Sequence, residues 1–488
     1  MERHNPSNKL MTDTINAVAE QQQTVPPEDI RCLASQRWLV MAAVGVGSIL
    51  GSLDTNVVNI ALPTIRHAFA TDVASVEWVV TIYLLATCGF LLTFGKIGDL
   101  QGQKPVYVCG FVTFVASSAL CGLAPSIAVL VLCRAIQGLG ASMLHSSAPA
   151  ILTSTFPANQ RGKVLGLQAI MVFLGMLIGP TLGGWLTDHL TWRSVFYINV
   201  PIGLIALVLS VKFIPDVKSG NREGSFDFTG AALFLIAFSL MLIGLSQGHA
   251  HGWTSRYILT IFAVALALLI GFVVVESHTS FPLLDLSLFR VRSFSMSVAS
   301  AVCYYMAVFT VGFLMPFLLI QGRGLSPSEA GLLISLQPAT MIIVAPVAGA
   351  FSDRIGTRGL AVFGTALLGL ALFLLSFADT TIPLRYIGIA MVMIGFGSGC
   401  FMAPNNSTML GSAPKHRQGI AAGVLATARY VGMICGVGIS GAIFTTFVRA
   451  HTDRAFYRGI HISFLVACAI SCVGCYTSAA RKHQAITV

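Results

Sequence analysis

The strongest constraint on this chain is a series of long apolar runs that recurs from Trp38 to the C-terminus. A helix needs about 20 predominantly apolar residues to cross a bilayer. Hydropathy therefore predicts an all-α membrane protein with about 14 spanning helices. We expect the spans near residues 38–62, 76–97, 105–124, 127–151, 164–187, 195–214, 228–247, 257–276, 294–320, 330–351, 359–378, 384–407, 419–447 and 460–480.

The composition also indicates that lipid surrounds most of the chain. Only 10% of the residues are charged and 55% are hydrophobic, whereas a soluble domain carries about 25% charged residues. The net charge of +10 could point to nucleic acid, but the basic residues lie singly between apolar runs. They form no stripe that could follow phosphates. The composition therefore predicts the lipid bilayer as a partner and excludes nucleic acid.

The distribution of Lys and Arg predicts the orientation. Nineteen of these residues fall on the side that holds both termini and eight on the other, so the positive-inside rule places both termini in the cytoplasm. The last loop on the other side is an exception, because it holds Arg449, Arg454 and Arg458. Residues 1–37 are polar and are expected to form a disordered cytoplasmic tail, and residues 481–488 a second cytoplasmic tail.

An internal repeat indicates two related bundles. GKIGDLQGQK (95–104) and GAFSDRIGTR (349–358) both fit the pattern G-x-x-x-D-x-x-G-x-[KR]. At a similar offset, two later segments each carry glycines four residues apart. Parallel repeats are a known transporter architecture, so we predict bundles over 38–214 and 294–480 with two inserted helices within 215–293. The matching residues are Gly95 with Gly349, Asp99 with Asp353, Gly102 with Gly356, Lys104 with Arg358, Gly175 with Gly432 and Gly179 with Gly436.

Several motifs together resemble the major facilitator superfamily. GKIGDLQGQK is similar to the signature loop of that family. The closer resemblance is to its fourteen-helix drug:proton antiporters, and it covers nearly the whole chain. It is carried by LDTNVVNIALP (53–63), RAIQGLGA (134–141), GMLIGPTLGG (175–184) and WRSVFYINVPIG (192–203).

The resemblance implies two six-helix bundles plus two inserted helices, and proton-coupled multidrug export by alternating access without a cofactor. In a bacterium with two membranes it also implies a periplasmic adaptor and an outer-membrane channel as partners. The chain departs from the family at Leu100 and Gln103, where basic residues are common, and it has no second-half proline matching Pro180. It has Arg429 where some relatives carry an acidic residue, which leaves the recognition of dicationic substrates open.

Asp54 and Arg134 are the two charges expected deep in the membrane. Asp54 lies about 13 Å from the helix end near Pro63, and Arg134 lies at a similar depth past Pro125. A bare carboxylate there is costly, so we expect Asp54 to take up a proton near neutral pH and to carry it. The resemblance implies that the first and fourth spans touch, so that Arg134 would stabilise the deprotonated carboxylate. The alternatives are a structural ion pair or helix cap for Asp54, and bonds to backbone carbonyls for Arg134.

The fifth span carries small residues at helical spacing. Gly175, Gly179 and Gly183 would form one flat face for close packing, and Gly184 continues the motif. Pro180 should bend this helix. We expect a bent helix at the seam between the bundles that controls a rocking motion, with plain close packing as the alternative.

The two signature loops place acids beside bases at the terminal side. Asp99 and Asp353 lie near Lys104, Arg354 and Arg358. Contacts among them are expected to latch this side shut, with loop capping as the alternative.

Polar and aromatic residues inside other spans are candidates for lining a substrate cavity. Each could instead form an interhelical hydrogen bond. These candidates are Asn59, His145, Gln168, Tyr304, Tyr305, Gln337, Asn405 and Asn406.

Other functions remain open at this stage. Cysteine spacing and the pair His249 and His251 supply no full ligand set, so no metal site is predicted. The sequence shows no Walker loop or nucleophile elbow, so it is not expected to be an enzyme. A dedicated exporter of one metabolite or self-made antibiotic, an uptake transporter, and a membrane-embedded enzyme or transport-dead receptor are the alternatives to multidrug export.

Overall fold

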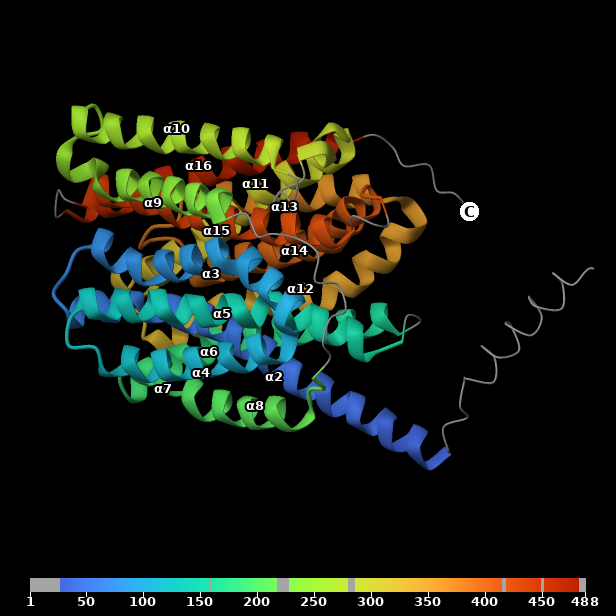
Figure 1. Ribbon diagram of the computed structural model, residues 1–488. Helices are drawn as coiled ribbons and strands as arrows, with labels where there is room; N and C mark the ends of the chain where they lie inside the picture. The colour runs from blue at the N-terminus through green and yellow to red at the C-terminus, as the bar shows by residue number, and fades with distance from the viewer. Residues whose placement is uncertain are drawn as a thin grey trace, which may run out of the picture.

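A computed structural model describes residues 27–157, 160–216, 228–279, 286–414, 418–448 and 452–481 of this chain. Within these ranges every regular element is a helix. Fourteen helices are long and apolar enough to cross a membrane, which confirms the all-α prediction and the number of spans (Figure 1). The chain is therefore a multi-pass membrane protein.

The helices follow one another with short connections. In chain order they are α2 (Pro27–Ala68), α3 (Val73–Gln101), α4 (Gln103–Leu123), α5 (Ile127–Thr155), α6 (Arg161–His189), α7 (Ser194–Tyr197), α8 (Asn199–Phe213), α9 (Phe228–His251), α10 (Arg256–His278), the 3₁₀ turn η1 (Leu286–Arg290), α11 (Arg292–Pro316), the π-helical turn η2 (Phe317–Gly322), α12 (Pro327–Ile355), α13 (Thr357–Ser376), α14 (Leu384–Gly411), α15 (Gln418–Val448) and α16 (Asp453–Ala479).

Two helices begin many residues before the spans that hydropathy predicted, whereas the others begin within a few residues of them. α2 begins at Pro27 rather than near residue 38, because proline at a first helical position followed by acidic residues favours a helix start. Residues 27–37 are thus helical rather than part of a tail. α16 begins at Asp453, capped by the Thr452 side chain, so Arg454 and Arg458 lie in its first turns rather than in a loop.

The helices form two bundles that share one seam. α2 packs on α6 and α8, and α5 packs on α3 and α4. In the second half, α11 packs on α15 and α16, and α14 packs on α12 and α13. α9 pairs with α10 and also contacts both α3 and α15, so the inserted pair lies across the seam. Pro27 and Ala479 lie at one end of the molecule, which we call the terminal end; the other is the far end (Figure 1).

The two bundles touch closely at the far end. Thr181 Oγ1 and Ser335 Oγ lie 2.7 Å apart across α6 and α12, and Ser328 donates to Asp188 over 2.7 Å. A Cβ atom on Gly184 would meet the backbone of Pro327. Only glycine at position 184 allows this close contact, which closes the far end between α6 and α12.

The same face of α6 is open toward the terminal end. Gly166 precedes Gly184 by five helical turns and so lies on the same face. A Cβ atom there would meet no described atom within 4 Å, and the same holds for Gly162. The structure is thus closed between α6 and α12 at the far end and open at the terminal end.

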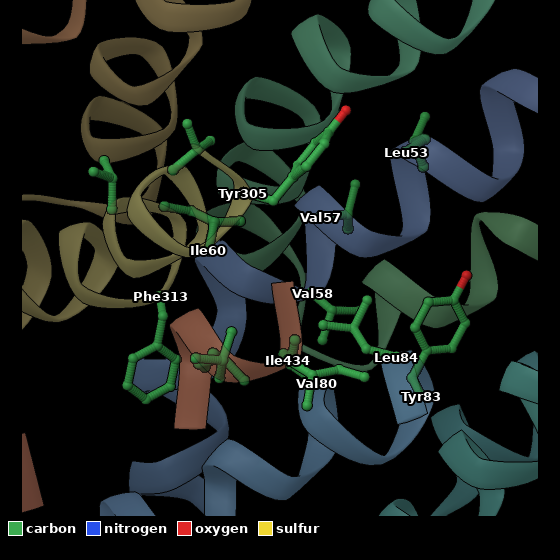
Figure 2. Close-up of a cluster of buried hydrophobic side chains, with 14 of the residues drawn as sticks. Leu53, Val57, Val58, Ile60, Val80, Tyr83, Leu84, Tyr305, Phe313 and Ile434 are labelled. Carbon is green, nitrogen blue, oxygen red and sulfur yellow. The ribbon is translucent and has the colours of Figure 1, made fainter. Parts of the chain in front are cut away.

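An apolar cluster fills the seam between the two bundles (Figure 2). It joins buried side chains of α2 and α3 to side chains of α11 and α15. Leu53, which precedes Asp54, belongs to this cluster. The neighbourhood of Asp54 therefore has little solvent. The labelled members are Leu53, Val57, Val58, Ile60, Val80, Tyr83, Leu84, Tyr305, Phe313 and Ile434.

Candidate functional site

Asp54 and Arg134 form an ion pair that is wholly buried. Arg134 Nη1 lies 2.6 Å from Asp54 Oδ2, and both side chains are 0% exposed. The other carboxylate oxygen, Oδ1, accepts from Gln137 Nε2 at 3.0 Å and from Asn199 Nδ2 at 2.7 Å. Three donors thus surround the oxygens of a wholly buried carboxylate.

The arginine is fixed on three sides. Its Nε donates to the Val79 carbonyl over 2.9 Å, and its Nη1 also donates to Gln137 Oε1 over 2.7 Å. Its guanidinium carbon lies 4.1 Å from the centre of the Tyr83 ring. The structure therefore combines the two alternatives posed from the sequence, an ion pair with Asp54 and a bond to a backbone carbonyl.

Sequence analysis missed Gln137 and Asn199. Gln137 lies one turn after Arg134 on α5, so both side chains reach the same point, and its Nε2 is held by Ser118 Oγ at 2.7 Å. Asn199 is the first residue of α8. Both residues lie inside motifs that had already been singled out, RAIQGLGA and WRSVFYINVPIG. A search of those motifs for amide side chains would have found them.

Glu77 is a second buried acid that sequence analysis missed. It is 4% exposed and lies one turn into α3 at the far end. Its carboxyl lies against α15, where a Cβ atom on Gly441 would meet Glu77 Oε2. This oxygen has no hydrogen-bond partner among the described residues. The signal was present in the sequence, since Glu77 is the second residue of the span predicted at 76–97.

The glycine stripe of α6 faces another helix of its own bundle. A Cβ atom on Gly179 would lie 2.7 Å from Asn56 Cβ, and one on Gly183 would lie 2.7 Å from Ile60 Cγ2, both of α2. Gly175 likewise lies against α2. The stripe therefore holds α6 on α2 within one bundle.

The seam is instead formed by two other residues of that motif. A Cβ atom on Gly331 of α12 would meet the Pro180 backbone, and Gly184 faces Pro327. Helical spacing explains the difference, since Pro180 and Gly184 are each one residue past a member of the stripe and so point about 100° away from it.

The repeated glycines allow close helix packing in both bundles. Gly432 of α15 lies against Tyr305 and Val302 of α11, where an added Cβ atom would lie 2.7 Å from Tyr305 Cβ. Gly436 lies against Met306 of the same helix. α15 thus packs on α11 as α6 packs on α2, which agrees with a duplicated bundle.

Each signature loop joins two helices through a glycine. Gly102 and Gly356 have φ of 103° and 88°, a region that favours glycine, and each joins two successive helices. Asp99 accepts from Gln103 Nε2 over 2.9 Å and forms no ion pair within 4 Å with Lys104 or any other described base. α4 begins at Gln103, which places that amide one turn from Asp99.

The second signature loop shows the same helix junction. Gly349 lies on α12 near Ala403, as Gly95 lies on α3 near Ser146. Arg354 and Arg358 are exposed. The side chain of Asp353 lies outside the described part of the structure, so the predicted contacts of Asp353 are untested.

Two predicted cavity residues meet in a pocket between the bundles. Asn59 of α2 and Gln337 of α12 both line a small cavity of about 40 Å³, together with Asn56, Pro180, Val308 and Gly312. This cavity lies beside the seam contact of Pro180.

A second group of predicted residues surrounds Arg429. The guanidinium carbon of Arg429 lies 5.6 Å from the Tyr305 ring centre. Tyr304 lies edge-on to Tyr305 at 4.9 Å. The His145 ring of the other bundle lies 6.3 Å from the Tyr430 ring.

The remaining candidates are placed elsewhere. Gln168 donates weakly to Ser48 Oγ at 3.4 Å within the first bundle. Asn405 is buried and accepts from Arg481 near the terminal end. Asn406 is half-buried on α14. The structure does not bring these three to the pocket or to Arg429.

Comparison with known proteins reveals related transporters. A sequence model of the Major Facilitator Superfamily matches residues 44–299 and 297–485. The chain is 33% identical over 445 residues to the riboflavin transporter RibZ of Clostridioides difficile, covering 90% of this chain and 96% of that one.

Two further relatives are named for resistance. The multidrug resistance protein Stp of Mycobacterium tuberculosis is 32% identical over 86% of this chain and 78% of its own. The tetracenomycin C resistance and export protein of Streptomyces glaucescens is 32% identical over 85% of this chain and 77% of its own.

The fold matches solved transporter structures as well. The crystal structure of the peptide transporter POT in complex with sulfate superposes with a TM-score of 0.67 at 14% identity, covering 91% of this chain and 96% of that one. At this identity the likeness concerns the fold alone.

Proposed function

Because the chain belongs to the Major Facilitator Superfamily, we propose that it is a proton-coupled antiporter that exports small amphipathic organic molecules. The observation that carries the proposal is the buried Asp54–Arg134 pair. Replacing this pair by neutral apolar side chains would often cost nothing or increase stability. We therefore attribute the buried pair to proton coupling, in which Asp54 takes up and releases the proton.

Protonation of Asp54 would change the contacts of its helix. A proton on the carboxyl removes the charge that holds Arg134 Nη1, Gln137 and Asn199. Arg134 cannot lose its own proton. Its guanidinium must therefore donate to other acceptors until Asp54 is deprotonated and the ion pair forms again. Asp54 is on α2, which contacts α11 of the other bundle. A change in its contacts thus reaches the seam directly.

The conformation supports loading from the terminal end. α6 and α12 meet at the far end and are apart near Gly166 and Gly162. The excess of Lys and Arg on the terminal side favours a cytoplasmic position for that end. In this orientation, substrate enters from the cytoplasm and leaves at the far end, while protons move inward.

Dedicated export of one compound is the second candidate, because one relative is named for the export of a single antibiotic; another is named as a transporter of riboflavin, without a direction. A panel of antibiotics is tested for protection of a susceptible host, and riboflavin is tested by its transport in vesicles. Protection against several unrelated compounds supports multidrug export, and protection against one supports dedication.

The mechanism is tested in inverted membrane vesicles with a pH-sensitive dye. Each compound of the panel is added to energised vesicles and proton release is followed. Asp54→Asn should abolish this release while the protein still inserts at normal abundance. Asp379→Asn is the matched control, because Asp379 is an exposed loop carboxylate bonded to Thr381 at the far end. Unchanged proton release in Asp54→Asn would overturn the proposal.

A further inference from the structure

Arg429 is a guanidinium between the bundles that lacks a counter-ion. It lies eleven residues into α15 from Gln418, about 16 Å from the terminal end of that helix. The only ion pair within 4 Å among the described residues is Arg134 with Asp54. Arg429 Nε has no hydrogen-bond partner there either. Its side chain is partly exposed, so it borders accessible space.

The surroundings of Arg429 are aromatic and come from both bundles. The Tyr305 ring lies 5.6 Å from the guanidinium carbon, and the Tyr305 hydroxyl has no described hydrogen-bond partner. Tyr304 lies behind it and stacks on Phe401 at 4.6 Å. Figure 2 shows the Tyr305 ring reaching from α11 toward α2 of the other bundle.

The first bundle contributes His145 to this group. Its ring lies 6.3 Å from that of Tyr430, and its Cε1 lies against Gly51 of α2, where a Cβ atom would come within 2.8 Å. His145 is polar but brings no negative charge. The acids buried in the neighbouring helices are engaged or distant, since Asp54 binds Arg134 and Glu77 lies at the far end.

A lone guanidinium at this depth is costly unless an anion accompanies it. Its planar fork is matched by a carboxylate or similar oxyanion in two parallel hydrogen bonds. Flat aromatic side chains favour flat aromatic ligands through offset or edge contacts. A cationic ligand would be repelled by Arg429 and would meet no described carboxylate to offset this.

We infer that Arg429, Tyr305, Tyr430 and His145 form the substrate site, and that its substrates are aromatic acids: planar ring systems that carry a carboxylate or another oxyanion. The inference rests on the proposed export function and adds its substrate class. The anion would sit on Arg429, with the ring system against Tyr305 and Tyr430. Arg429, Tyr430 and His145 are each partly exposed, so the group borders accessible space.

Paired ligands that differ only in charge test this site. Purified full-length protein in lipid nanodiscs is titrated with benzoate, 2-naphthoate and anthracene-2-carboxylate, and with the neutral amide of each, by equilibrium binding. In the wild type at least one acid should bind tenfold or more tightly than its amide. Arg429→Gln should remove this preference, and Arg429→Lys should retain part of it. Arg358→Gln, an exposed arginine of the same bundle, should leave it unchanged.

The outcomes are decisive in both directions. No preference for any acid in the wild type, or a preserved preference in Arg429→Gln, overturns the site. Arg429→Lys guards against a folding defect, because it keeps the charge and should elute as a single species. Binding needs no proton gradient, so this result is independent of whether Asp54→Asn stops transport, and failure of one proposal leaves the other measurable.

Discussion

The Asp54 carboxylate on α2 and the Arg134 guanidinium on α5 meet at 2.6 Å in a place where neither side chain is exposed. Breaking one partner of such a pair leaves an uncompensated buried charge, which costs about 3–5 kcal/mol. The same pair can therefore be examined by stability as well as by transport.

Arg134→Gln should lower the free energy of unfolding by about 3 kcal/mol or more, because Asp54 then loses its cation. Adding Asp54→Asn to the same chain should recover part of that loss, since both charges are gone. Thermal unfolding in detergent of the two single variants and the double variant gives the coupling energy. Additive losses would show that the two side chains do not interact.

Asn199→Ala should lower the free energy of unfolding by about 1.5–3 kcal/mol. Asn199 donates to Asp54 Oδ1 over 2.7 Å, and a hydrogen bond to a charged group contributes about 1.5–3 kcal/mol. Thermal unfolding in detergent measures the loss. Gln168→Ala, whose amide donates to Ser48 Oγ over the longer distance of 3.4 Å, is the control and should cost less. Equal losses in both variants would contradict a stabilising bond between Asn199 and the carboxylate.

Gly184→Ala and Gly166→Ala should have opposite effects on stability. Both lie on one face of α6, but a Cβ atom on Gly184 meets the Pro327 backbone and one on Gly166 meets open space. Alanine in open space favours the helix by about 0.5–1 kcal/mol. The melting temperature should therefore rise slightly in Gly166→Ala and fall in Gly184→Ala. A fall of equal size in both would contradict the open terminal end.

Glu77→Gln should make the contact between α3 and α15 at the far end insensitive to the pH of the solution at that end. The Glu77 carboxyl lies against Gly441 without a described hydrogen-bond partner for Oε2, which suits a neutral acid and not a charged one. Among the described residues, no base lies within 4 Å of the Glu77 carboxyl. α9 brings Ser246, which binds Trp78.

Distances between spin labels at the far ends of α3 and α15 provide the measurement. They should lengthen with rising pH in the wild type and stay short in Glu77→Gln. Glu329→Gln at the same end should behave as the wild type, because Glu329 is exposed and caps α12 with Ser326. A wild-type distance that does not respond to pH would remove Glu77 from far-end closure.

Local patterns in the sequence were enough for the spans, because apolar length decides a spanning helix. The pairing of Asp54 with Arg134 also needed the family resemblance, which places the first and fourth spans in contact. The contact of Pro180 and Gly184 with α12 of the other bundle could not be predicted in the same way. A stripe of glycines shows that some helix approaches closely but not which one, and only the packing assigns Gly175, Gly179 and Gly183 to α2.

The group around Arg429 could not be assembled from the sequence for a related reason. Its members come from α5, α11 and α15, and their meeting depends on how two bundles are placed against each other. Tyr305 and His145 were each plausible as a cavity residue or as an interhelical bond. The latch at Asp99 stays a prediction for the state closed at the terminal end, because in this open conformation Asp99 accepts from Gln103, four residues later in the chain.

The inserted helix α9 touches α3 of one bundle and α15 of the other. This contact braces one flank of the molecule, where Leu92 lies beside Gly423 and Glu77 beside Gly441 on the facing sides of α3 and α15. The opposite flank, between α6 and α12, has no such brace among the described helices. Any movement that separates α3 from α15 must therefore also carry α9 away from at least one of them.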